Sequence, residues 1–304
     1  MEVAMIDKNV DYKMNEEVYL TLIEQYISVY ENALRMIISQ IHTFGVVKRN
    51  VNSHIVLALR HILVLLDGIK TLYIAKNTES AQLLLRSITE EFVQLSYFLQ
   101  NPDAVEEKNA LYNLCSEISL RNYEKKSKNY EKNSTFEKPI FSQEIIDETI
   151  ARYPQYRYLI KKSQPSWYRA YAFKEEKKIR NIYQLFENIT LINDDKGSIL
   201  YDIIYRKISL YGHGNQHNDA LYRIDDSFFV ISHRCLRSSS VYIIAIELVM
   251  ASLIKTLRDF YKIKYSYTFS LPLVELNNQC SLVKKIKELD DTLPVYYDEY
   301  LSVS

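Results

Sequence analysis

The chain has 304 residues, enough for one large domain or two ordinary ones. It carries 38 Lys and Arg residues against 38 Asp and Glu residues, so no overall electrostatic field would draw nucleic acid or an acidic membrane to it. With 5 glycines and 6 prolines, it lacks the turn residues that a β-rich protein of this length needs. The composition therefore predicts long helices with few connections.

The three cysteines are far apart in the sequence: Cys115, Cys235 and Cys280. Their odd number and wide spacing favour buried or half-buried thiols in a reducing cytosol over a disulfide framework or a zinc knuckle. Met1 to Asn15 alternates charged and apolar residues, unlike a signal peptide. The most apolar stretch, Val241 to Ile254, contains Glu247 and is too short to span a bilayer. We therefore expect a cytoplasmic protein with no membrane segment.

Apolar residues recur at helical spacing along the first third of the chain. They predict three helices, from Glu16 to about Ile41, from about Asn52 to Ala75 and from near Ser80 to Leu99. Because their connections are short, these helices should be antiparallel neighbours, as in an up-and-down bundle.

A fourth helix is predicted from Asp103 to about Tyr123, and a fifth from Gln143 to Arg152. The segment between them, Glu124 to Lys138, is the most polar part of the chain and is predicted to be a mobile loop. It is the one soft boundary in what we expect to be a single elaborated helical domain, residues 1–304.

The second half is predicted to add helices from Phe173 to Ile189, from about Lys196 to Tyr211, from about Phe228 to Tyr261 and from Ser281 to Leu289. Asn215 to Asp226 is expected to be irregular, Tyr265 to Leu271 to be a short extended piece, and the tail after Pro294 to have little to hold it. The predicted fold is all-α, a multi-helix bundle with an up-and-down core and additional C-terminal helices.

The most promising chemical site is the segment from Tyr205 to His213. On a helix, Tyr205 or Arg206, then Ser209, then His213 share one face. Glycines on both sides of His213 end the helix, so its imidazole can be exposed, and the helix C-terminus favours its protonated form. The alternative is structural: Ser209 bonds back to a helix carbonyl, and His213 caps the helix end.

A second candidate is the pair Arg86 and Glu90, four residues apart on the third predicted helix. On a surface such a pair contributes only about 0.3–0.5 kcal/mol. The pair is nevertheless set in an apolar run, so it lies either on the outer face or at a buried functional position. The buried alternative predicts that Arg86 reaches across to the stripe that ends at His213.

The remaining histidines give weaker signals. His54 and His61 lie seven residues apart, but no carboxylate has zinc spacing beside them, which favours a solvated or interface stripe over a metal site. His217 is either a second site histidine or a solvated loop residue. The sequence contains no P-loop, dinucleotide fingerprint or nucleophile elbow, so we expect no metal and no cofactor.

Two resemblances follow from these residues. The pattern of Leu84 to Glu90, Trp167, and Tyr205 to His213 resembles a family of helical bacterial proteins of unknown function, over about Val51 to Phe260. That likeness implies a helical fold and names residues, but it implies no reaction.

The Arg206 to His213 spacing also resembles the HEPN superfamily, small helical bundles that are often dimeric and occur in toxins and antiviral systems. Many members are metal-independent ribonucleases with an Arg followed by a His after four to six residues. The resemblance implies that His213 is a general acid or base, that Arg206 holds the phosphate, and that Ser209 and Tyr205 orient the substrate. It further implies RNA cleavage to a 2′,3′-cyclic phosphate in a homodimer, used in phage defence or growth arrest.

We expect the substrate to be bound or oriented also by Arg86, Glu90, Trp167 and His217. The competing hypothesis is a non-catalytic module that senses a ligand or a regulatory protein partner and uses Arg86, Glu90, Ser209 and His213 as a structural polar network. A third hypothesis is the binding of a small molecule or nucleotide in the bundle core.

Overall fold

Helices account for most of the regular structure of the protein. The computed structural model describes residues 12–43, 50–127, 142–192, 196–206, 221–224, 227–231, 236, 240–271, 279–290, 293 and 297–301. Within these ranges, helix packs on helix through a shared apolar core. The all-α, multi-helix fold predicted from the sequence is confirmed.

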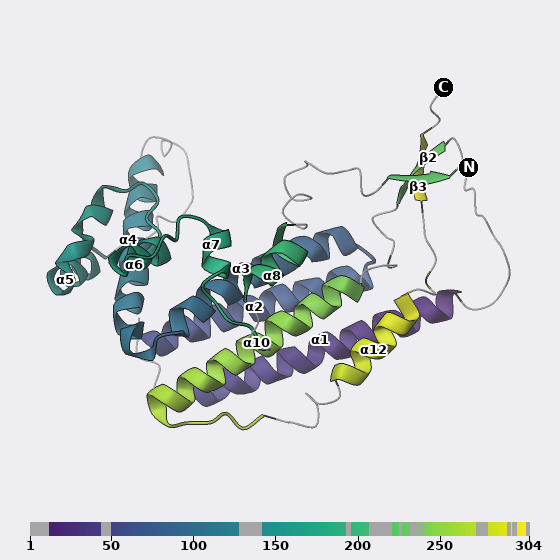
Figure 1. Ribbon diagram of the computed structural model, residues 1–304, viewed down its shortest axis with the longest axis horizontal. Coiled ribbons are helices and arrows are strands. Elements are labelled where there is room, and N and C mark those ends of the chain that lie inside the picture. Colours follow the sequence, from purple (N-terminus) through teal and green to yellow (C-terminus); the bar gives the residue numbers. More distant parts are fainter. Residues whose placement is uncertain are drawn as a thin grey trace.

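Long helices form the main bundle (Figure 1): α1 (Tyr12–His42), α2 (Val51–Ile74), α3 (Thr78–Leu99), α10 (Ser240–Tyr265) and α12 (Gln279–Asp290). α2 packs against α1 and α3, α10 packs on α3, and α12 contacts α1 and α10. Asparagine side chains begin two of the helices, because Asn50 accepts the amide hydrogen of Ser53 and Asn77 accepts that of Ser80. Lys76, at a φ of 56°, ends α2 in the left-handed region.

Hydrogen bonds of buried polar side chains join these helices at defined positions along their axes. The Tyr26 hydroxyl of α1 donates to the Ile243 carbonyl of α10, at 3.3 Å. The Tyr261 hydroxyl of α10 donates to the Asn52 side-chain oxygen of α2, at 2.8 Å. Since an unpaired buried hydroxyl is costly, these bonds fix the register of the helices as well as their contact.

A second group of helices lies at one end of the bundle (Figure 1): η1 (Pro102–Ala104), α4 (Val105–Ser127), α5 (Gln143–Arg152), η3 (Pro154–Lys161) and α6 (Trp167–Lys174). Lys108 of α4 joins this group to α3. Its buried ammonium group donates to the carbonyls of Tyr97 and Phe98, at 2.7 and 3.2 Å, and lies over the rings of Tyr97 and Tyr171. Burial lowers the pKa of Lys108 to about 8.

The predicted helix from Phe173 to Ile189 is wrong. α6 ends at Lys174, and Glu176 takes a left-handed conformation with a φ of 56°. The polar run that follows has no apolar face to bury, and helix resumes only in α7 (Ile182–Phe186). The predicted helix from Lys196 begins with α8 (Ser198–Leu200) and η4 (Tyr201–Tyr205), a π-helical turn that continues into Arg206.

The predicted helix start at Phe228 is also wrong, because that residue lies in a small antiparallel sheet. The strands are β1 (Leu221–Ile224), β2 (Ser227–Ile231) and β3 (Tyr297–Leu301), in the order β1-β2-β3. The sequence predicts little to hold the tail after Pro294, but β3 lies in that tail and pairs along β2, with Phe228 opposite Leu301. The sheet is an addition to the helical fold and stands apart from the bundle (Figure 1).

α10 is long and apolar enough to cross a membrane by length and composition alone. However, 61% of its most apolar window is buried inside the protein, as in the core helix of a soluble protein. Val249, Leu253 and Leu257 are fully buried against the bundle. The observation is consistent with the expectation of a soluble chain.

Candidate functional site

Arg86, Glu90 and Tyr205 form one hydrogen-bonded cluster, which we call the α3–η4 cluster. The Tyr205 hydroxyl donates to Glu90 Oε1 at 2.5 Å. Arg86 donates to the same carboxylate oxygen through Nε, at 3.1 Å, and to the Tyr205 hydroxyl through Nη2, at 3.3 Å. Each of the three groups therefore contacts the other two.

The cluster has a buried side and an open side. Tyr205 is 6% exposed, whereas the side chains of Arg86 and Glu90 are 25% and 35% exposed. Burial, and next the hydrogen bond to Glu90, raises the pKa of Tyr205 to about 12. The hydroxyl therefore stays protonated near neutral pH and remains a donor, while the guanidinium and the carboxylate keep faces that solvent can reach.

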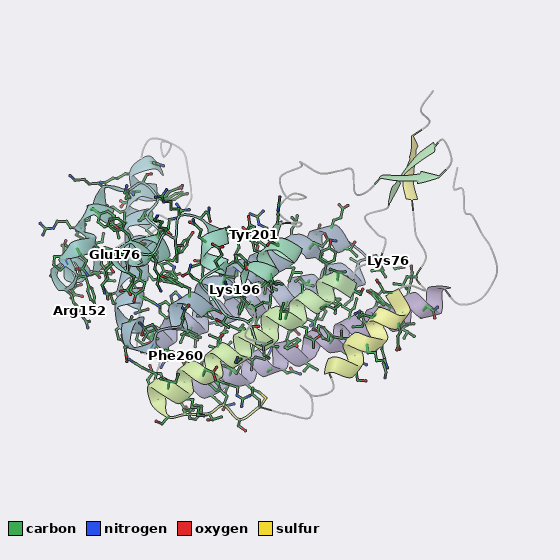
Figure 2. The ribbon with its side chains drawn as sticks, in the orientation of Figure 1. Lys76, Arg152, Glu176, Lys196, Tyr201 and Phe260 are labelled. Atoms are coloured by element: carbon green, nitrogen blue, oxygen red, sulfur yellow. The ribbon has the colours of Figure 1, made fainter. Side chains whose placement is uncertain are left out.

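Aromatic rings extend this cluster along the 183–205 segment. The Arg86 guanidinium lies 5.2 Å from the centre of the Tyr205 ring, in cation–π contact. Tyr205 stacks on Tyr201, with ring centres 5.3 Å apart, and Tyr201 meets Tyr183 edge-on at 4.8 Å. Tyr201 and Tyr183 are both partly exposed. Figure 2 shows the region of this segment, with Tyr201 and Lys196 labelled near the middle of the view.

The local chain path explains how Tyr205 reaches α3. The segment before α8 closes on itself, because the Gly197 amide donates to the Ile189 carbonyl at 3.0 Å. A Cβ on Gly197 would lie 2.5 Å from the Phe186 carbonyl oxygen, so only glycine permits this approach. η4 then places Tyr201 and Tyr205, four residues apart, with stacked rings, and packs on α3.

The structure brings together only some of the residues that the sequence singled out. Arg206 follows Tyr205 directly and is exposed, and Arg86 and Glu90 lie beside Tyr205. The three residues that complete the predicted stripe and its loop lie outside the described residues: Ser209, His213 and His217.

Trp167 is not part of the α3–η4 cluster. It begins α6 and is 5% exposed, with its ring centre 6.0 Å from that of Tyr97 and 5.8 Å from that of Phe98. These contacts are at the C-terminal end of α3, about three helical turns from Arg86. Trp167 packs the second group of helices onto the bundle.

The two histidines of α2 lie in different environments, one enclosed by aromatic rings and one on the surface. His54 stacks on Phe98 with ring centres 4.3 Å apart, and its burial lowers its pKa to about 4. His61 bonds to Glu91 at 2.8 Å on the surface. Across the described ranges no group of three or more His, Cys, Asp or Glu side chains could hold a metal ion.

No motif in the sequence marks Tyr183 or Tyr201 as a site residue. Their signal was the abundance of tyrosine, 26 residues, but composition alone does not say which rings stack. The spacing of four between Tyr201 and Tyr205 is a helical neighbour relation that could have identified that pair.

A model of one protein family matches residues 52–227, which is more than half of the chain. The match spans α2 to the start of β2, including every member of the α3–η4 cluster, and leaves out α1, α10 and α12. No curated protein and no solved structure matches the chain. The chain belongs to the family of unknown function DUF5677.

Proposed function

We propose that the protein is a metal-independent endoribonuclease whose active centre is built where the segment ending at Arg206 packs on Arg86 and Glu90. The observation that supports this most is the α3–η4 cluster. It joins the residue before Arg206 to a cation and an anion of α3 within hydrogen-bond distance. The cluster thereby holds the start of the Arg206 to His213 motif at a surface that solvent can reach.

The chemistry follows from the motif. His213 acts as general base on the RNA 2′-hydroxyl, or as general acid on the leaving oxygen, and Arg206 neutralises the phosphate in the transition state. The 2′-oxygen attacks the phosphorus, the bond to the 5′-oxygen breaks, and the product carries a 2′,3′-cyclic phosphate. Arg86 and Tyr205 orient the motif, with Ser209 and His217 as further substrate contacts.

The aromatic residues beside the cluster favour a single-stranded substrate. Nucleobases stack on aromatic rings, with about 1–3 kcal/mol per base, and Tyr183 and Tyr201 offer partly exposed rings next to a guanidinium. One chain supplies one Arg–His pair, so the proposal includes a homodimer in which two motifs complete the site. Its proposed setting is the cytoplasm, in phage defence or growth arrest.

The proposal is tested by incubating the purified protein with total RNA and a chelator. We expect the wild type to degrade the RNA and His213→Ala to leave it intact. His61→Ala, which changes an exposed histidine bonded to Glu91, is the matched control and should be as active as the wild type. Equal RNA survival with the wild type and with His213→Ala would remove the enzyme proposal.

One observation favours a second function, a non-catalytic module that senses a ligand or binds a regulatory protein. Arg86, Glu90 and Tyr205 satisfy one another within a single chain, as a structural network would. In that case RNA survival would be the same with Arg206→Ala, with His213→Ala and with the wild type. Glu90→Gln would lower the free energy of unfolding of the protein.

A further inference from the structure

The chain as a whole is neutral, but the segment 152–180 is strongly basic. It holds nine Lys and Arg residues against two Glu residues and no Asp. All nine basic residues are exposed. They lie at the end of α5, on η3, on α6 and in the chain that leads to α7, at one end of the molecule (Figure 1). This end therefore carries a local positive field that the overall charge balance conceals.

Most of these basic side chains have no partner within the part of the chain that the structure describes. Of the nine, Lys174 alone pairs there with carboxylates, those of Glu107 at 2.7 Å and Glu175 at 3.7 Å. Arg152 and Arg169 lie over neighbouring tyrosine rings, which leaves their N–H groups without acceptors. The other six side chains form no hydrogen bond or ion pair in the described ranges, so their charges are available to a ligand.

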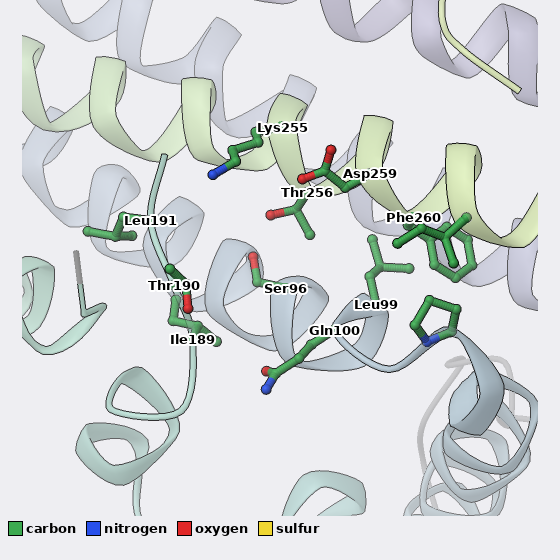
Figure 3. A pocket seen from close by; sticks show the side chains of 12 residues that line it. Ser96, Leu99, Gln100, Ile189, Thr190, Leu191, Lys255, Thr256, Asp259 and Phe260 are labelled. Atoms are coloured by element: carbon green, nitrogen blue, oxygen red, sulfur yellow. The ribbon is translucent and has the colours of Figure 1, made fainter. Parts of the chain in front are cut away.

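The pocket between α3, α10 and the segment 189–191 shows the contrast (Figure 3). It has a volume of about 280 Å³, and Lys255 is the lysine that lines it. The Lys255 ammonium group donates to the Ile192 carbonyl at 3.2 Å, so its charge is already used within the chain.

Two aromatic rings lie exposed on the basic end of the molecule. Phe173 of α6 is 76% exposed, the highest value for a large apolar side chain in the described ranges, and Tyr158 of η3 is 40% exposed. Their ring centres are 6.3 Å apart, in edge contact, which joins η3 to α6. Because apolar ring surface in contact with water is unfavourable, a flat apolar partner that covers these rings would be favoured.

The helical geometry places one cation beside each ring. η3 is a 3-10 helix, in which residues three apart lie on one face, so Lys161 shares the face of Tyr158. In α6, Arg169 and Phe173 are four apart and share a face of the helix. Since the two rings meet, the two faces form one surface that carries Lys161, Tyr158, Phe173 and Arg169 in this order. We call it the η3–α6 surface.

We propose that the η3–α6 surface binds single-stranded RNA. Nucleobases stack on Phe173 and Tyr158, and phosphates pair with Arg169, Lys161 and the other basic side chains of this end. A flexible single strand suits such a surface, because each nucleotide offers both an unpaired base and a negative charge. In a duplex the bases are stacked on one another and cannot reach the rings.

The choice of RNA rests on the proposed function, to which this surface would add a second contact with the substrate. The chain from Lys174 to Arg180 leads from the surface to α7, which carries Tyr183 and contacts α8. In Figure 1 α7 lies between α6 and α8. A strand that extends from the η3–α6 surface along this path reaches the stacked tyrosines beside the α3–η4 cluster.

The test is fluorescence anisotropy of the full-length protein with an unstructured single-stranded 2′-O-methyl RNA oligonucleotide. The methylated 2′-oxygen cannot attack phosphorus, so binding is measured apart from cleavage, and failure of one proposal is distinguished from failure of the other. The single strand should bind, and the blunt duplex of the same sequence should bind about tenfold more weakly because its bases cannot stack on the rings.

Phe173→Ala should weaken binding by about fivefold or more, because it removes one stacking ring. It should leave the salt dependence of binding unchanged, because the ring carries no charge. The side chain is exposed, so the variant should melt at the temperature of the wild type. Val64→Ala, which shortens a side chain that is 69% exposed on α2, is the matched control and should bind as the wild type does.

The double variant Lys161→Gln/Arg169→Gln supplies a second readout. The slope of log affinity against log salt concentration should become shallower by about 1.4, because each phosphate contact to a single strand contributes about 0.7. Arg60→Gln/Arg258→Gln removes the same charge from exposed positions on α2 and α10 and should leave the slope unchanged.

Unchanged affinity in both Phe173→Ala and Lys161→Gln/Arg169→Gln would overturn the proposal. A duplex that binds as tightly as the single strand would overturn it as well. Binding to vesicles that contain phosphatidylserine, lost in Phe173→Ala and found without binding of the oligonucleotide, would assign the surface to a membrane instead of RNA.

Discussion

The Tyr205 hydroxyl lies 2.5 Å from Glu90 Oε1, although the two residues are 115 positions apart in the sequence. Arg86 bonds to both groups from the turn of α3 that precedes Glu90. The bond therefore does two things: it anchors η4 on the bundle, and it fixes the backbone immediately before the exposed Arg206.

Removing the Tyr205 hydroxyl should destabilise the protein. In Tyr205→Phe, Glu90 keeps Arg86 as a partner but loses its shortest hydrogen bond, so the free energy of unfolding should fall by about 1–2 kcal/mol. Urea denaturation measures the change. Tyr201→Phe is the matched control, because no hydrogen bond of that hydroxyl is seen in the described residues, and it should change the free energy by less than about 0.5 kcal/mol.

Arg86 and Tyr205 should be energetically coupled. Arg86→Met removes the guanidinium and Tyr205→Phe removes the hydroxyl that accepts its hydrogen bond, so the double variant should be more stable than the sum of the single effects predicts, by about 0.5–3 kcal/mol. A double-mutant cycle of unfolding free energies measures this coupling. Additive effects would mean that the hydrogen bond between the guanidinium and the Tyr205 hydroxyl contributes nothing to holding η4 on α3.

Stability should fall in mild acid because of His54. Its pKa is lowered from 6.5 to about 4 in the folded protein, chiefly by burial, so between those pH values the unfolded chain binds more protons than the folded one. The free energy of unfolding should therefore decrease as the pH falls from about 6.5 to 4, by about 1–3 kcal/mol.

Melting curves of the wild type and His54→Leu across this pH range check that expectation. The variant has no imidazole to protonate, so its curve should be flatter by the same amount. His61→Leu is the control, since His61 is exposed beside Glu91 and not enclosed by Phe98. A slope that is unchanged in His54→Leu would assign the acid sensitivity to other groups.

Gly197→Ala should disturb the chain path to η4. The added methyl group would lie 2.5 Å from the Phe186 carbonyl oxygen and closer still to an atom of Ile189, so backbone must move, at about 1–3 kcal/mol. Gly68→Ala is the contrasting control. Its methyl group meets only the flexible tip of Leu84, at 2.7 Å, and alanine favours helix by about 1 kcal/mol, so it should change stability by less. Thermal denaturation measures both.

Local sequence signals predicted the helices of the first half closely. α5 has the predicted bounds, Gln143 to Arg152. α2 differs from the prediction by one residue at each end, and α3 begins two residues earlier and ends at Leu99 as predicted. These helices combine an apolar stripe with side-chain caps. Both signals depend only on residues that are close together in the sequence. For Arg86 and Glu90 the sequence leaves two alternatives, an outer face or a buried functional position, and the contact of Arg86 with Tyr205 is the one that the buried alternative predicts.

Non-local pairing explains what the sequence could not predict. Phe228 to Ile231 is a short apolar run, which suits a strand or a buried helix equally well, and its strand state depends on β3, about 70 residues further along. Trp167 was grouped with the site because of its place in a motif. Its position at the far end of α3 depends on how α6 docks, which no local pattern encodes.

The measurement that tests the central claim most directly is cleavage of an unstructured RNA oligonucleotide in the presence of EDTA, with analysis of the product ends. The proposed site predicts fragments with 2′,3′-cyclic phosphates, no cleavage of the same oligonucleotide with 2′-deoxyriboses throughout, and loss of cleavage in Arg206→Ala and His213→Ala. An intact oligonucleotide at equimolar protein, or equal cleavage by the wild type and His213→Ala, would contradict the account.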